Sequence, residues 1–266
     1  MTSKIGACSW TLGITDPERM LSLLHTLGVS HYHYCEDALQ TSPERLASLS
    51  AQAGLRISAV DPFNAFPEAG AARTEANCLA LYARYIDFAA RCGAGAICFQ
   101  AVGIWAGHFD APREGLVRCV SQLTALALKR GVQPVYEIVN RYESPLIHTV
   151  GEALDTLAAP LAQGLRLVLD SFHLQIEEPD PVDAIAEALP YLHEYQISDS
   201  NRGAIGEGHI PFAAHKAALD AGGYERDVIV ETVLPECGYH QPPANAQQLQ
   251  RLAAQQRQSV HAWTML

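Results

Sequence analysis

The chain has 266 residues, 48% of them hydrophobic and 18% charged, which is typical of a globular protein with one large domain or two small ones. Eighteen Lys and Arg against 29 Asp and Glu give a net charge of −11. This balance argues against sequence-independent nucleic-acid binding, because neutralising phosphates requires a basic surface. No apolar run reaches the roughly 18 residues of a membrane span, and the N-terminus lacks a signal-peptide pattern.

The seven cysteines include no C-x-x-C pair. Cys8, Cys35, Cys92 and Cys98 fall in apolar or strand-like segments. The odd count and the large chain argue against a disulfide framework. We therefore predict buried thiols in a protein of the reducing cytoplasm. From the lack of a long apolar run we expect no membrane partner.

Short strand-like runs alternate with longer amphipathic runs along the chain. The predicted strands are Lys4–Ser9, Ser30–Cys35, Arg56–Val60, Gly95–Gln100, Gln133–Glu137, Leu165–Asp170, His193–Ser198 and Asp227–Glu231. The predicted helices are Pro17–Leu27, Pro43–Ala53, Arg73–Cys92, Arg113–Arg130, Val150–Ala162, Val182–Leu189, Phe212–Ala221 and Ala244–Ala262. Eight such repeats predict an α/β fold, a closed (β/α)8 TIM barrel, with an open doubly wound sheet as the alternative. No linker divides the chain, so we expect a single domain over residues 1–266 with a C-terminal closing helix.

The last four predicted strands carry a polar residue at or near their carboxyl ends: Glu137, Asp170, Gln196 and Glu231. Because the carboxyl ends of barrel strands open on one face, these side chains are expected to converge there. Three carboxylates packed together repel one another and are costly to bury, and a hard divalent cation relieves both effects. Unrelated charges facing solvent are the alternative.

The same rim is predicted to hold further binding groups. His173 lies three residues beyond Asp170, and Arg202 follows the seventh strand, so both are candidates to bind substrate oxygens. Pairing of Arg202 with Asp199 is the alternative. Three aromatic residues after strands one, three and four are candidates to stack on the apolar face of a substrate, or simply pack around the barrel mouth: Trp10, Phe63 and Trp105.

Four segments carry a resemblance to a known family: EIVNRYE (137–143), LDSFHLQIEE (169–178), SDSNRGAIGEGHIPF (198–212) and VIVE (228–231). In order and spacing they resemble the ketose 3-epimerases typified by D-tagatose 3-epimerase, within the xylose-isomerase-like TIM-barrel superfamily. The resemblance covers roughly residues 130–232, and the N-terminal half matches only as a βα pattern.

The resemblance implies one divalent metal ion (Mn²⁺, Co²⁺ or Mg²⁺) bound by Glu137, Asp170, Gln196 and Glu231. Glu137 and Glu231 then correspond to the catalytic acid–base pair on opposite faces of the sugar. Groups that hold substrate oxygens correspond to Glu143, His173 and Arg202. The implied enzyme is an isomerase of carbohydrate metabolism that epimerises a ketose at C3 through a metal-bound cis-enediolate.

Gln196 departs from the epimerase pattern, which has a histidine at this place, and is similar to the hydroxypyruvate-isomerase branch. His193 cannot replace it, because a residue three positions earlier on a strand points to the opposite face. A hydroxypyruvate-type isomerase and a metal-dependent dehydratase of the inosose or dehydroshikimate type therefore stay open. A non-catalytic sugar-binding protein is the alternative from a different class.

The expected partner is a small, unphosphorylated sugar. No Gly-rich loop with an adjoining Lys or Arg is present to bind a phosphate. Gly206-Glu207-Gly208 places an acid where a phosphate would be repelled. A homo-oligomer stays open.

Overall fold

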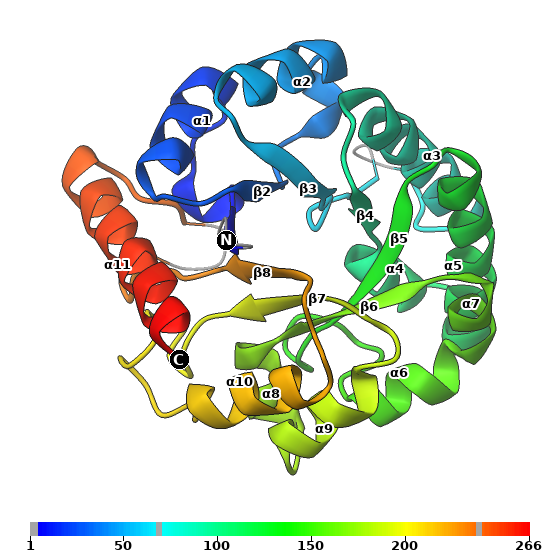
Figure 1. Cartoon of the computed structure of the whole chain (residues 1–266). Helices are drawn as coiled ribbons and strands as arrows, with labels where there is room; N and C mark the ends of the chain where they lie inside the picture. The colour runs from blue at the N-terminus through cyan, green and yellow to red at the C-terminus, as the bar shows by residue number, and fades with distance from the viewer. Residues whose placement is uncertain (1–4, 68–70, 238–240) are drawn as a thin grey trace.

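The computed structural model describes residues 5–67, 71–237 and 241–266, so that the predicted strand residue Lys4 lies outside the described residues. Eight parallel strands pair in chain order, and the last pairs with the first to close a barrel (Figure 1). They are β1 (Ile5–Cys8), β2 (His31–Tyr34), β3 (Arg56–Val60), β4 (Ala96–Cys98), β5 (Gln133–Ile138), β6 (Arg166–Asp170), β7 (Leu192–Ile197) and β8 (Asp227–Val230). The predicted (β/α)8 barrel is confirmed, and the open-sheet alternative is wrong.

Helices surround the barrel (Figure 1). They are α1 (Pro17–Thr26), α2 (Pro43–Gln52), α3 (Glu75–Cys92), α4 (Gln100–Ala106), α5 (Pro112–Lys129), α6 (Val150–Thr156), α7 (Ala158–Gln163), α8 (Ser171–Glu177), α9 (Pro181–Ala188), α10 (Phe212–Ala221) and α11 (Ala246–Met265). Two short 3-10 helices, η1 (Trp10–Leu12) and η2 (Ala38–Gln40), follow β1 and β2. None of the helices among the described residues is long and apolar enough to cross a membrane.

The helix prediction needs two corrections. The single helix predicted over Val150–Ala162 is two helices, α6 and α7, which meet at Leu157. The short helices α4 and α8 were not predicted, and each begins within two residues of the end of a strand. They matter for the site because α8 begins directly after Asp170 and carries His173.

Local signals explain where the first helices begin. The Asp16 carboxylate accepts a hydrogen bond from the backbone N–H of Arg19, and the Ser42 hydroxyl accepts one from that of Arg45. A proline occupies the first turn of each helix, where its missing N–H costs nothing. These caps set where α1 and α2 begin.

The register between β6 and β7 slips by one residue. Leu167 pairs with Leu192 and Val168 pairs with Glu194, which leaves His193 as an extra residue in β7. A bulge of this kind bends the strand and changes where the following side chains point. The bulge lies just before the part of β7 that enters the candidate site.

Beyond the bulge, the side chains of β7 alternate between the two faces of the barrel wall. Tyr195 packs outward, where its hydroxyl hydrogen-bonds with His215 of α10 and its ring stacks on Trp263 of α11. Glu194 faces the interior, where its carboxylate accepts a 2.6 Å hydrogen bond from His33 of β2, on the other side of the barrel. Gln196 shares that interior face.

The large apolar core lies between the barrel wall and the helices. A separate cluster of five small side chains from neighbouring strands packs together: Ala59, Ala96, Cys98, Val135 and Val168. On the outside, α11 lies beside β8, between α1 and α10 (Figure 1). Its Gln256 donates a 2.9 Å hydrogen bond to the Thr11 hydroxyl, which ties the end of the chain to η1.

Candidate active site

The four predicted strand-end residues are buried at the carboxyl ends of β5 to β8. Glu137 and Gln196 lie within β5 and β7, Asp170 ends β6, and Glu231 directly follows β8. Their exposed fractions are all 7% or less. Asp170 and Gln196 are register partners in neighbouring strands. The alternative that they are charges facing solvent is therefore wrong.

Arg202 lies between two of these carboxylates. One of its terminal nitrogens, Nη1, donates to Asp170 Oδ2 and, at 2.9 Å, to the Ser198 hydroxyl. The other, Nη2, lies 3.1 Å from Glu231 Oε1. The guanidinium also lies 4.7 Å from the ring centre of Phe172, a cation–π contact. Arg202 thus bridges β6 and β8 with one buried positive charge.

The alternative pairing of Arg202 with the Asp199 carboxylate is wrong. That carboxylate instead accepts backbone N–H groups of Ser200, Gly206 and Ile210. Asp199 therefore organises the loop after β7, and this loop holds Arg202 with a left-handed φ of 63°.

His173 comes from α8 and lies against Glu137. Its Nε2 is 3.6 Å from Glu137 Oε1. The Asn140 side-chain amide donates to His173 Nδ1 at 2.8 Å and to Glu143 Oε1 at 3.0 Å. Because Nδ1 accepts a hydrogen bond, the neutral ring carries its proton on Nε2, which faces Glu137. Asn140 was not predicted as a site residue, and it links the predicted groups His173 and Glu143.

The Gln196 side chain is held by a hydrogen bond to the preceding inward-facing residue of β7. Its Nε2 donates to Glu194 Oε1 at 3.1 Å, and Glu194 Oε2 in turn accepts from His33. The amide oxygen of Gln196 is buried without a hydrogen-bond partner. Glu194 therefore decides which atom of the amide is available to a ligand.

Burial and mutual repulsion shape the protonation of the carboxylates. Burial, then the charges of Glu231, Asp61 and Asp170, raises the pKa of Glu137 well above its ordinary value. Burial also raises the pKa of Glu231 to about 7, against the opposing effect of Arg202. Burial alone would raise the pKa of Asp170 too, but the guanidinium of Arg202 lowers it. Glu137 and Glu231, whose pKa values are raised, can therefore take up a proton more readily than Asp170, whose pKa is lowered.

These residues fit a hard divalent cation. Donor atoms of Glu137, Asp170 and His173 all lie within 4.8 Å of one another. Gln196 Oε1 and Glu231 Oε2 are buried oxygens without hydrogen-bond partners, a costly state that a cation relieves. Carboxylate and amide oxygens are ligands suited to Mg²⁺ or Mn²⁺.

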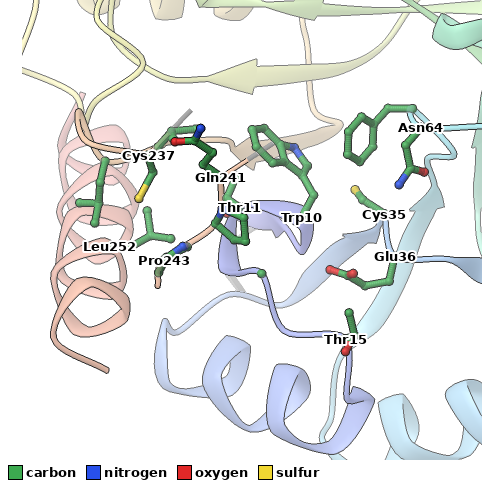
Figure 2. Close-up of a pocket in the computed structure, with 15 residues that line it drawn as sticks. Trp10, Thr11, Thr15, Cys35, Glu36, Asn64, Cys237, Gln241, Pro243 and Leu252 are labelled. Atoms are coloured by element: carbon green, nitrogen blue, oxygen red, sulfur yellow. The ribbon is translucent and has the colours of Figure 1, made fainter. Parts of the chain in front are cut away.

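Two of the three predicted aromatic residues meet at a pocket of about 210 Å³ beside the carboxylates (Figure 2). The ring centres of Trp10 and Phe63 are 5.7 Å apart, and both residues line the pocket. Trp10 also donates from Nε1 to Glu231 Oε1 at 2.7 Å, so it joins the pocket to the carboxylate cluster. Trp105 is not in this group: it is buried in α4 and donates to the Ala65 carbonyl at 2.5 Å.

Sequence reasoning missed two further acids at this end of the barrel. Asp61 directly follows β3 and is buried, with donor atoms of Cys98 and Glu137 within 4.8 Å of its own. Burial raises its pKa to about 6, although the charge of His33 lowers it. Glu36 lines the pocket, and burial raises its pKa to about 7. The run Val60-Asp61 carried the same strand-end signal that identified Asp170.

Comparisons with known proteins agree with this geometry. The model of the xylose isomerase-like TIM barrel family matches residues 12–256. A ketose 3-epimerase of Arthrobacter globiformis is 32% identical over 204 residues, which cover 73% of this chain and 68% of that protein. An L-ribulose 3-epimerase of Mesorhizobium japonicum is 37% identical over 138 residues, 49% of this chain and 46% of that protein.

Solved structures share the fold over nearly the whole chain. The D-psicose 3-epimerase of Clostridium cellulolyticum H10, solved with D-tagatose, superposes with a TM-score of 0.78 at 19% identity. The match covers 99% of this chain and 98% of that one. At this identity the likeness concerns the barrel itself.

Proposed function

Because the chain belongs to the xylose isomerase-like TIM barrel family, we propose that it is a divalent-metal-dependent ketose 3-epimerase acting on a small free sugar. The observation that carries the proposal is the pair of buried glutamates, Glu137 and Glu231, which come from β5 and β8 to one site. Burial raises the pKa of both, as reversible proton transfer near neutral pH requires.

The relatives support the class of reaction. The relatives from Arthrobacter and Mesorhizobium are named as 3-epimerases, and epimerases are isomerase-class enzymes. The chain is accordingly an isomerase-class enzyme. It spans about two thirds of the first of these relatives and about half of the second, so the sugar and the carbon atom are part of the proposal.

The metal ion would be held by Glu137, Asp170, Gln196 and Glu231. When bound, it supplies Lewis-acid stabilisation of the negative charge that develops on sugar oxygens when a neighbouring carbon loses its proton. The unpartnered oxygens of Gln196 and Glu231 support this assignment. Arg202 already contacts Asp170 and Glu231, so it would supply a second positive charge to the same carboxylates when the ion is bound.

The two glutamates perform the proton transfers. One carboxylate takes the proton from C3, and the other, protonated, returns a proton to the opposite face of the same carbon. Which glutamate acts first depends on the configuration of the substrate, so the pair works in both directions. Two bases are needed because a single base would return its proton to the face from which it came.

Neighbouring side chains orient the sugar and the glutamates. Asn140 fixes the ring of His173 and holds Glu143, which places an Nε2–H donor and a carboxylate acceptor where they can bind sugar oxygens. Trp10 donates to Glu231 and so fixes one of its oxygens, while Trp10 and Phe63 form an aromatic wall that excludes water. The buried free cysteines among the described residues support a reducing cytoplasm as the compartment.

Aldose–ketose isomerisation of the hydroxypyruvate type is the second candidate. The observation that favours it is Gln196, whose amide oxygen is buried without a hydrogen-bond partner next to Asp170 and is one of the proposed metal ligands. Both reactions begin with loss of a proton beside a carbonyl group. They differ in the carbon that receives the proton back.

Solvent-deuterium exchange tests the proposal directly. The purified protein with Mn²⁺ is incubated in D2O with a panel of free ketoses, and the position of the label is read by NMR. We expect deuterium at C3 and the appearance of the C3 epimer. Label at C1 would favour the isomerase, and no label with any sugar would overturn both candidates.

A further inference from the structure

A second group of metal-binding side chains lies outside the carboxylate site, where β1 and β2 meet. One donor atom each from Cys8, His33 and Cys35 lies within 4.8 Å of the other two. Cys8 ends β1 and is the register partner of His33 in β2, and Cys35 directly follows β2. All three side chains are about 1% exposed. We propose that they form a binding site for a soft divalent cation such as Zn²⁺ or Cd²⁺.

The state of the imidazole supports a metal ligand. His33 Nε2 donates to Glu194 at 2.6 Å, whereas the other ring nitrogen, Nδ1, is buried without a hydrogen-bond partner. Histidines that bind metals typically donate their second ring nitrogen to a carboxylate, which fixes the ring and makes the ligand more basic. His33 and Glu194 have this arrangement, so a bound cation would replace only the proton that the ionised pair carries on Nδ1.

The chemistry of the three donors selects the ion. Two thiolates and a neutral imidazole are a soft ligand set, unlike the oxygen ligands of the carboxylate site. Two thiolate charges balance those of one divalent cation, so the buried cluster becomes neutral on binding. In a tetrahedral zinc site the ligand atoms lie about 3.5 to 4 Å apart, so small side-chain rotations suffice to close this cluster on an ion.

The site also has an approach from solvent. Cys35 lines the pocket of about 210 Å³ together with Trp10 and Phe63 (Figure 2). The same two aromatic residues pack against Cys8 and Cys35. Trp10 packs against the cysteine cluster and also donates to Glu231, so its side chain separates the two groups of metal-binding residues.

Cadmium titration under reducing conditions tests the proposal. Cd²⁺ bound to thiolates gives an ultraviolet charge-transfer band that oxygen ligands do not give. We expect the band of the unmodified protein to saturate at one equivalent of Cd²⁺. Cys8→Ser and Cys35→Ser should each lower the Cd²⁺ affinity at least 100-fold. Cys237→Ser is the matched control, because Cys237 lines the same pocket outside the cluster and its loss should leave the band unchanged.

A further variant separates this site from the one proposed for the epimerase. Asp170→Asn should weaken Mn²⁺ binding and retain the cadmium band. A band that disappears with Asp170→Asn, or that persists in both cysteine variants, would overturn the second site whatever the outcome for the epimerase.

Zinc X-ray absorption gives a readout that needs no variant, in case the serine substitutions impair folding. With one equivalent of Zn²⁺, the unmodified protein should show two sulfur ligands at about 2.3 Å and a nitrogen at about 2.0–2.1 Å. A shell made of oxygen and nitrogen alone would contradict the proposal.

Discussion

The side-chain nitrogen of Gln196 donates a 3.1 Å hydrogen bond to Glu194, and its side-chain oxygen is left buried and unpartnered. Glu194→Gln replaces one of the two acceptor oxygens with an NH2 donor, so the side chain can no longer accept from both Gln196 and His33. We expect Mn²⁺ affinity to fall 10- to 100-fold, as is usual for groups that orient metal ligands. Isothermal titration with Mn²⁺ measures the change without reference to turnover. The exposed acid Glu187 offers a control, since Glu187→Gln should bind Mn²⁺ like the unmodified protein.

Glu137→Gln and Glu231→Gln each remove one of the two groups that exchange protons with the sugar. Each variant should lose at least about 100-fold in kcat, because general acid–base catalysis contributes at least that much. Circular dichroism should show an unchanged fold. Near-normal turnover in either variant would refute the two-base mechanism.

Trp10→Phe keeps an aromatic ring in the pocket but removes the N–H that holds Glu231 at 2.7 Å. That hydrogen bond lowers the pKa of Glu231, so its loss should move the acidic limb of the kcat profile to higher pH. We expect kcat to fall about 10-fold, because losing one hydrogen bond to a charged group costs roughly 1.5 kcal/mol. Phe63→Leu, which removes the neighbouring aromatic ring, should alter KM more than the pH profile.

Removing the metal ion should affect stability as well as turnover. Treatment with a chelator should abolish epimerisation, and Mn²⁺ should restore it. Because an ion that binds only the folded state stabilises it, Mn²⁺ at 100 times its Kd should raise the free energy of unfolding by about 2.7 kcal/mol. Thermal unfolding with and without Mn²⁺ measures this. Equal melting temperatures in the two conditions would contradict a metal site in the folded protein.

The buried pair of His33 and Glu194 predicts how stability depends on pH. Burial alone would lower the pKa of His33, but the charge of Glu194 raises it from 6.5 to about 9. The stabilisation from this pair is therefore complete below about pH 6.5 and is lost as the pH rises through about 9.

Comparison with His33→Gln isolates this effect. The difference in unfolding free energy between the unmodified protein and the variant should shrink by up to about 3 kcal/mol as the pH is raised over that range. Denaturant unfolding at several pH values measures it. A difference that grows with pH would show that the pair is not ionised as proposed.

The sequence predicted the barrel well because strand and helix periods repeat eight times. Each strand among the described residues lies within two residues of its predicted bounds. The helix α4, with the sequence QAVGIWA, was missed because it is buried on nearly all sides and shows no polar face. As a result Trp105 was expected at the rim, whereas the turn of this helix directs its indole toward Ala65.

The site was predictable where a polar residue interrupts an apolar strand end, as at Asp170. It was not predictable where the partner comes from across the barrel. Glu194 meets His33, 161 positions away in the chain, and no local pattern reports that pairing. The position of Arg202 between Asp170 and Glu231 likewise depends on a loop conformation that the residue types alone do not specify.

The bulge at His193 has a consequence for insertions and deletions. Loss of Tyr195, the one residue between Glu194 and Gln196, would reverse the alternation of β7 from that point and turn the Gln196 amide away from the barrel interior, toward α10. Loss of His193 would only regularise the ladder and leave the alternation beyond it intact. The candidate site is thus sensitive to a deletion within residues 194–196 of β7 and tolerant of the loss of His193, one residue earlier.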